Sequence, residues 1–167
     1  MPLIKHSRVV DDPWIPVADD GPLPAAGPVL VSLARWRSDR DALIGRGEPL
    51  GVRLASHETA PEIAADLPHL ALVAITFPTY RDGRGYTTAR LLRQRHRFQG
   101  ELRAVGNVLR DQFLFLQRCG FDAYDVAKDA DVAAWRAAIE EMSVWYQPAA
   151  DHRVPAVRRR HLREAAE

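Results

Sequence analysis

The sequence has little of what several common functions require. A single cysteine, Cys119, stands among 167 residues, which excludes an intramolecular disulfide, a cysteine-ligated iron–sulfur cluster and a thiolate zinc site within the chain. No apolar run approaches the roughly 20 residues that a bilayer requires, and charges interrupt the first residues too early for a signal peptide. We therefore expect a cytoplasmic protein without a metal site or a membrane span, whose redox cofactor, if it uses one, is organic or belongs to a partner.

The chain also lacks an excess of charge of one sign, because its formal net charge is +1. General binding to nucleic acid needs a strong basic excess that displaces counterions from phosphates, so the composition argues against it. The charge is nevertheless unevenly placed: between residues 81 and 118, nine arginines stand against Asp82, Glu101 and Asp111; the arginines are Arg81, Arg84, Arg90, Arg93, Arg95, Arg97, Arg103, Arg110 and Arg118. The composition therefore does not exclude a local binding site for an anion.

Short apolar runs alternate with amphipathic stretches from Pro28 onward. Five strands are predicted, at 28–33, 50–56, 70–77, 100–107 and 121–127, with the most apolar run, 70–77, at the centre of the sheet. Helices are predicted at 35–44, 57–70, 86–97, 108–119 and 131–146. Such alternation implies parallel pairing with right-handed crossovers. We predict an α/β fold: a single domain with a mainly parallel five-stranded sheet and flanking helices. We favour an open, doubly wound sheet over the alternative, an incomplete β/α barrel.

Three segments are expected along the chain. Residues 1–27, with five prolines, predict an irregular arm that holds at most a short strand at Arg8–Val10. Residues 28–148 form the α/β domain, and residues 149–167 form a charged tail.

The stretch "RDGRGYT", residues 81–87, follows the central strand and precedes a helix. Ligands of parallel α/β sheets bind at the carboxyl ends of the strands. The glycines there permit close backbone approach, the helix start directs free amides at an anion, and Arg81 and Arg84 add bidentate donors. The alternative is a tight turn whose arginines are solvated or paired with Asp82 or Glu101.

From this topology we expect one polar cleft at the carboxyl ends of the strands. Asp82 should orient an arginine in it; the expected ligand-binding residues are Tyr80, Arg81, Asp82, Arg84, Tyr86, Asn107 and Arg110. His57 is a weaker candidate for a general base. Cys119 is predicted to be a buried structural thiol, since it stands at a helix C-terminus. Leu114 and Phe115 fall off the apolar stripe of their helix, which indicates either a helix buried on two sides or a surface for a partner or a second copy.

The segment "FPTYRDGRGYTTARLLRQRHRFQGELRAVGNVLRDQFLFLQRCGFDAYDV", residues 77–126, closely resembles the most distinctive block of domain-of-unknown-function family 934, a family of bacterial proteins. Genes of this family lie beside that of sulfite reductase, so its members are labelled oxidoreductases or accessory proteins of sulfite reduction. The resemblance implies a role in assimilatory sulfur metabolism. Asn107 departs from the aspartate that is usual in the family, which puts in doubt any role that needs a carboxylate there.

Two classes of function follow from the resemblance and the arginines. In the first, the protein is an enzyme, an oxidoreductase of sulfite reduction, or a ligand-binding subunit that holds a small oxyanion such as sulfite, sulfate or a phosphorylated cofactor. In the second, it is a non-catalytic accessory or assembly partner of sulfite reductase. The sequence shows no flavin or nicotinamide fingerprint, so it assigns no cofactor.

Overall fold

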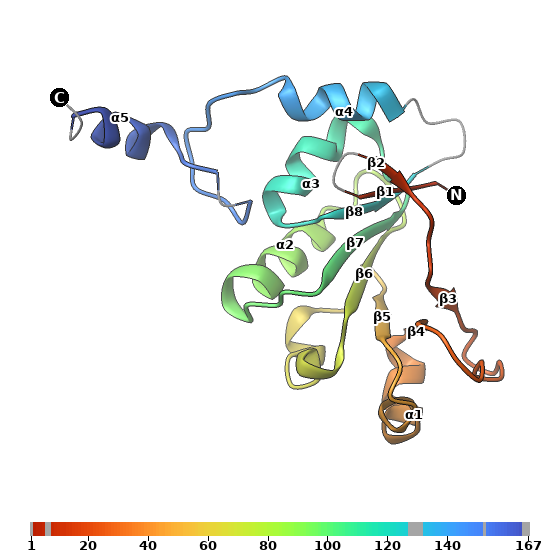
Figure 1. Ribbon diagram of the computed structural model, residues 1–167. Helices are drawn as coiled ribbons and strands as arrows, with labels where there is room; N and C mark the ends of the chain where they lie inside the picture. The colour runs from red at the N-terminus through yellow and green to blue at the C-terminus, as the bar shows by residue number, and fades with distance from the viewer. Residues whose placement is uncertain (1, 6–7, 127–131, 152, 165–167) are drawn as a thin grey trace.

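One sheet contains all eight strands of the described residues, in the order β2-β1-β8-β7-β6-β5-β4-β3 (Figure 1). The computed structural model describes residues 2–5, 8–126, 132–151 and 153–164. From β3 to β8 each strand runs parallel to the strand before it in the chain, whereas β1 pairs antiparallel with β2 and β8. The strands are β1 Leu3–Lys5, β2 Arg8–Val10, β3 Ile15–Pro16, β4 Val29–Ser32, β5 Leu50–Leu54, β6 Leu72–Phe77, β7 Glu101–Gly106 and β8 Ala123–Asp125.

The sheet is a half-barrel with flanking helices, so the preferred prediction of a five-stranded, doubly wound sheet is wrong. The alternative, an incomplete β/α barrel, describes the observed order. A doubly wound sheet reverses its strand order and covers both faces with helices. Here the parallel strands never reverse, and right-handed crossovers then deliver the helices to one face. Central placement and parallel pairing of β6 agree with the prediction.

Helices α1 Leu33–Gly45, α2 Arg84–Arg90, α3 Phe113–Cys119 and α4 Val132–Glu140 lie on one side of the sheet, whereas α5 Ala156–Glu164 projects away from it (Figure 1). Side chains from α1 to α4 join those of the strands in one buried core that includes Trp36, Phe77 and Phe113. Ser32 caps α1 by accepting a hydrogen bond from the backbone N–H of Arg35 at 3.0 Å. Gly120 ends α3 in the left-handed conformation, which glycine adopts without strain.

Two of the predicted helices differ in the structure. The stretch 57–70 forms two 3₁₀ turns, η1 Ala60–Ile63 and η2 Leu67–His69, because Pro68 has no N–H for a continued helix. The helix expected over 86–97 begins at Arg84 as α2 and changes to a π-helical turn, η3 Leu91–Arg95. A further 3₁₀ turn, η4 Arg110–Gln112, precedes α3, and α4 ends earlier than the 146 that was expected. Residue 131, where that helix was expected to begin, lies outside the described residues.

The first 27 residues contribute three strands: the short strand expected at Arg8–Val10 is β2, and β1 and β3 stand where an irregular arm was expected. Residues 11–14, which we call the strap, join β2 at one edge of the sheet to β3 at the other. Five residue steps span at most about 18 Å, whereas eight flat strands would extend over about 34 Å. The sheet must therefore curl, and Figure 1 shows the strap on the side of the sheet opposite α2 and α3. There Trp14 packs on a small apolar cluster of Leu30, Leu72 and Ala74.

Candidate functional site

The predicted site residues follow β6 and β7, whose parallel pairing brings both loops to one edge of the sheet. Tyr80 belongs to the loop after β6, and Arg110 begins the 3₁₀ turn after β7. The two loops touch, since the side-chain amide of Gln112 donates to the carbonyl of Tyr80 at 3.3 Å. Asn107 is exposed, and its backbone N–H donates to the carbonyl of Phe77 at 2.7 Å. The topology thus explains why these residues share an edge.

Asp82 holds Arg84 in a two-point ion pair. Arg84 Nε lies 2.9 Å from Asp82 Oδ1, and Arg84 Nη2 lies 2.6 Å from Asp82 Oδ2. The same Nη2 donates to Ser56 Oγ at 2.9 Å, which ties in the loop after β5. The hydrogen bonds from Arg84 and Ser56 hold the pKa of Asp82 well below its ordinary value, and the pKa of Arg84 is raised by the same pair. Arg84 is therefore an oriented guanidinium whose charge a carboxylate already balances.

The other two predicted arginines lie in different surroundings. Arg110 donates from Nε to the carbonyl of Ala134 at 3.1 Å and forms an ion pair with Glu141. Arg81 lies over the ring of Tyr80, 5.6 Å from its centroid, and donates to its hydroxyl at 3.1 Å. Within the described part of the chain, Arg81 alone of the three predicted arginines has no carboxylate partner. It is the one that is free to receive an anion.

The glycines of the 81–87 loop have a packing role. A Cβ at Gly85 would lie 2.8 Å from Phe77 Cζ and 3.0 Å from Ile75 Cγ2, so α2 approaches β6 too closely for a side chain. Gly83 precedes α2, and a Cβ there would meet Tyr86 at an ordinary 3.6 Å. The close approach that the sequence predicted is thus made by the backbone of the helix to its own sheet.

Exposed aromatic and aliphatic groups surround Gln112 at this edge. Tyr86 contacts the buried Phe77 and the exposed Phe115, with centroid distances of 5.2 and 4.7 Å. Phe115 is 56% exposed and Tyr80 is 54% exposed. Gln112 accepts from the backbone N–H of Leu109, also exposed, at 3.1 Å. We call Tyr80, Tyr86, Leu109 and Phe115 the aromatic edge patch. Its members include Phe115, as the helix pattern predicted, while Leu114 is half-buried.

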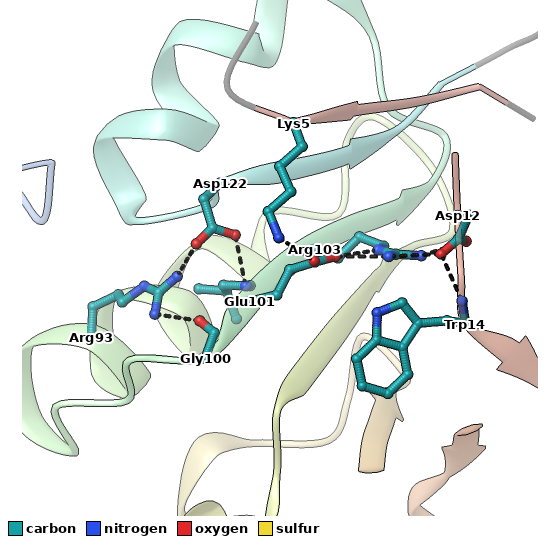
Figure 2. Close-up of polar contacts among 9 residues, drawn as sticks. Lys5, Asp12, Trp14, Arg93, Gly100, Glu101, Arg103 and Asp122 are labelled. Atoms are coloured by element: carbon teal, nitrogen blue, oxygen red, sulfur yellow. Dashed lines mark hydrogen bonds and ion pairs between the residues drawn. The ribbon is translucent and has the colours of Figure 1, made fainter. Parts of the chain in front are cut away.

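The concave face of the sheet holds an ion-pair chain that sequence reasoning missed. Arg103, which is 2% exposed, donates to both carboxylate oxygens of Asp12 in the strap, at 2.7 and 3.0 Å, and to Glu101 at 2.8 Å (Figure 2). Glu101 also accepts from Lys5 Nζ of β1 at 2.8 Å. The sequence offered one signal of this chain. Glu101, Arg103 and Val105 alternate with Leu102 and Ala104, so the two charged side chains lie on the same face of β7. The partner in the strap lies 91 positions away, and no sequence spacing indicates it.

A second feature that sequence reasoning missed is the guanidinium of Arg93, which joins the two loops that precede β7 and β8. It donates to the carbonyls of Phe98, Gly100 and Gly120 at 2.6, 2.8 and 2.9 Å, and to Asp122 at 2.8 Å. Figure 2 shows the bonds to Gly100 and Asp122. Burial raises the pKa of Asp122, against the opposing effects of the Leu102 N–H and of Arg93.

The remaining candidates show little chemistry. Cys119 is buried, as predicted, and burial raises the pKa of its thiol to about 11, so it is a neutral thiol at pH 7. His57 lies exposed in the loop after β5. A search of the described residues finds no group of three or more His, Cys, Asp or Glu that could hold a metal ion. Nor does any helix in this part of the chain have the length and apolar character to cross a membrane.

Comparison with known proteins agrees with the resemblance of residues 77–126. The chain has no match among curated proteins. A family model described as a bacterial protein of unknown function, DUF934, matches residues 51–157, from β5 into α5. The matched range includes every residue of the predicted site and of the aromatic edge patch. Because it covers more than half of the 167 residues, the chain belongs to the DUF934 family.

Proposed function

We propose that this protein works with sulfite reductase in sulfur assimilation, in the cytoplasm, as a non-catalytic partner that binds through the aromatic edge patch. The choice of sulfite reductase rests on the resemblance of residues 77–126 and on the gene neighbourhood of that family. The observation that carries the mode of action is the exposure of Phe115 and Tyr80 next to Arg81. Aromatic residues and arginine supply most of the energy at protein interfaces.

The geometry of the patch favours binding of a protein surface. The edge-on contact with Tyr86 restricts the ring of Phe115, so little side-chain entropy remains to be lost on binding. Asp82 and Glu141 already balance Arg84 and Arg110. A partner can therefore cover Arg84 and Arg110 without leaving either charge unpaired.

The affinity of purified sulfite reductase for the parent and for Phe115→Ala tests the proposal. A central aromatic anchor contributes about 2 kcal/mol or more, so we expect binding to weaken by roughly 30-fold. Tyr146→Ala is the matched control, because Tyr146 is 80% exposed and lies outside the patch. Absence of binding by the parent, or equal affinities of Phe115→Ala and the parent, would contradict the proposal. Self-association that Phe115→Ala abolishes, without binding of sulfite reductase, would assign the patch to a homo-oligomer instead.

A second candidate function is favoured by Arg81. This arginine has no carboxylate partner in the described residues and lies beside the loops that follow β5, β6 and β7. In this alternative the carboxyl edge binds a small oxyanion, and the protein acts as a ligand-binding subunit or an oxidoreductase. Sulfite, sulfate or phosphate should then raise the thermal midpoint of the parent by mass action, and Arg81→Ala should remove the rise. Thermal midpoints of the parent that are the same with and without each of the three salts would exclude this alternative.

A further inference from the structure

A cavity of about 620 Å³, lined by both polar and apolar groups, lies at the amino-terminal edge of the sheet, opposite the aromatic edge patch. Its lining residues precede β7 and β8 or belong to the end of α3 and the chain that follows α4; those with polar side chains include Gln94, Arg97, Gln99, Gln117, Asp122 and Asp151. The volume is in the range of small-molecule sites. None of the residues proposed above to bind sulfite reductase lines it.

Two ion pairs lie in the walls of this cavity, and in each pair the carboxylate balances the charge of the arginine. On one side Arg93 binds Asp122 at 2.8 Å. On the other, Arg118 binds Asp151 at 3.1 Å, while the backbone N–H of Ala150 donates to the carbonyl of Arg118 at 3.0 Å. Arg97 is the remaining charged residue of the lining. Among the residues that the structure describes, it has no carboxylate partner, and it is exposed.

The backbone of Arg97 makes this arginine unusual. It follows the π-helical turn η3 and has φ of 54°, the one positive φ of a non-glycine residue in the described ranges. Glycine is favoured at such a position after a helix, because an L side chain is strained there. π-helical turns and strained non-glycine residues both concentrate at functional sites. Arginine thus stands where the fold alone would favour glycine.

We infer that this cavity binds a small organic anion, with a phosphate or carboxylate group against the guanidinium of Arg97. A guanidinium presents paired donors to either group. The amides of Gln94, Gln99 and Gln117 offer donors and acceptors to a polar ligand body. An adjoining hollow of about 370 Å³ shares Arg97 and Gln99. His96 lines it, and His96 Nε2 is buried without a hydrogen-bond partner among the described residues.

Thermal unfolding with inorganic phosphate, glycerol 3-phosphate and glutarate tests the inference and separates the two anionic groups. A probe at about ten times its dissociation constant should raise the midpoint of the parent by roughly 3–5 °C. Arg97→Gly should lose this rise. Without any probe, the same variant should melt roughly 2–4 °C above the parent, because it relieves the strained backbone. Replacement of a residue with only a structural role would not raise the stability of the fold and at the same time remove the response to the probe.

Arg158→Ala removes one positive charge from an exposed position outside the cavity, and it should keep the probe-dependent rise. In NMR spectra, the side-chain amides of Gln94, Gln99 and Gln117 should shift on titration of the parent. The inference is overturned if none of the three probes raises the midpoint, if the rise persists in Arg97→Gly, or if Arg158→Ala loses it equally. Amide shifts confined to the carboxyl edge would also overturn it, and a lower midpoint for Arg97→Gly without a probe would refute the argument from strain.

Discussion

At the scale of single residues, the two glycines of the 81–87 loop show how similar sequence signals carry different physical demands. Sequence spacing places both near a helix start, but only the structure shows that Gly85 touches β6. Gly85→Ala should destabilise the fold by about 1–3 kcal/mol, since its Cβ would overlap buried Phe77. Gly83→Ala should change stability by less than about 1 kcal/mol. Urea unfolding of the two variants measures this difference, and equal losses would refute the packing role.

The ion pair between Asp82 and Arg84 makes a prediction about pH. A carboxyl group whose pKa is lowered on folding stabilises the native state above its unfolded pKa, here 3.8, and this contribution fades as the pH falls below that value. In an NMR titration, the Asp82 carboxyl should still be ionised at about pH 3 in the parent. In Arg84→Ala its pKa should return toward 3.8. An unchanged titration curve in the variant would show that Arg84 is not the cause.

At the scale of elements, apolar runs predicted the positions of the parallel strands well, whereas helices that contain proline were predicted poorly. The runs over 70–77 and 100–107 became β6 and β7 because a buried parallel strand needs an unbroken apolar sequence. The stretch 57–70 has helical periodicity, but Pro68 prevents one continuous helix, and the stretch forms two 3₁₀ turns. β1 and β3 escaped notice because strands of two or three residues between prolines and charges carry too little pattern, whereas the short strand at Arg8–Val10 was expected and is β2. The π-helical turn had no sequence signal.

Arg93 links its own π-helical turn to the loops before β7 and β8, and its geometry predicts that lysine cannot replace it. The guanidinium places four hydrogen bonds on three carbonyls and one carboxylate. A lysine ammonium has three donors and lacks the planar fork. We expect Arg93→Lys to destabilise the fold by about 2–4 kcal/mol, since at least one charge-assisted bond is lost and buried acceptors stay unpaired.

Denaturant unfolding measures this effect. Arg90→Lys is the matched control. Arg90 is exposed at the end of α2, directly before the turn that holds Arg93, and its side chain makes no hydrogen bond or ion pair with the described residues. The control should unfold within about 0.5 kcal/mol of the parent. A loss in Arg93→Lys as small as that of Arg90→Lys would show that the charge of Arg93, and not its fork, holds the loops.

At the scale of the whole molecule, alternating strands and helices predicted the α/β class but left the strand order open. A doubly wound sheet and a half-barrel have the same alternation, and they differ in how the layers are arranged in space. The shared edge of Arg84 and Arg110 followed from parallel pairing alone. The pairing of Arg84 with Asp82 could be expected from their closeness in sequence. The partner of Arg110 could not, because Glu141 lies 31 positions away, and side chains so distant in sequence meet only through the tertiary fold.

The last prediction concerns the strap, which the buried Arg103 holds across the concave face. Arg103→Ala should destabilise the fold by about 3–5 kcal/mol, because Glu101 would keep a buried charge with only Lys5 beside it. Asp12→Ala should cost less, since Asp12 is 38% exposed and Arg103 would retain Glu101. The double variant should be little worse than Arg103→Ala alone, because the two residues share one interaction. Hydrogen exchange should accelerate at residues 11–16 in all three variants, since each removes the bond that fastens the strap. Strictly additive losses, with unchanged exchange in that segment, would show that Trp14 packing alone holds the strap on the sheet.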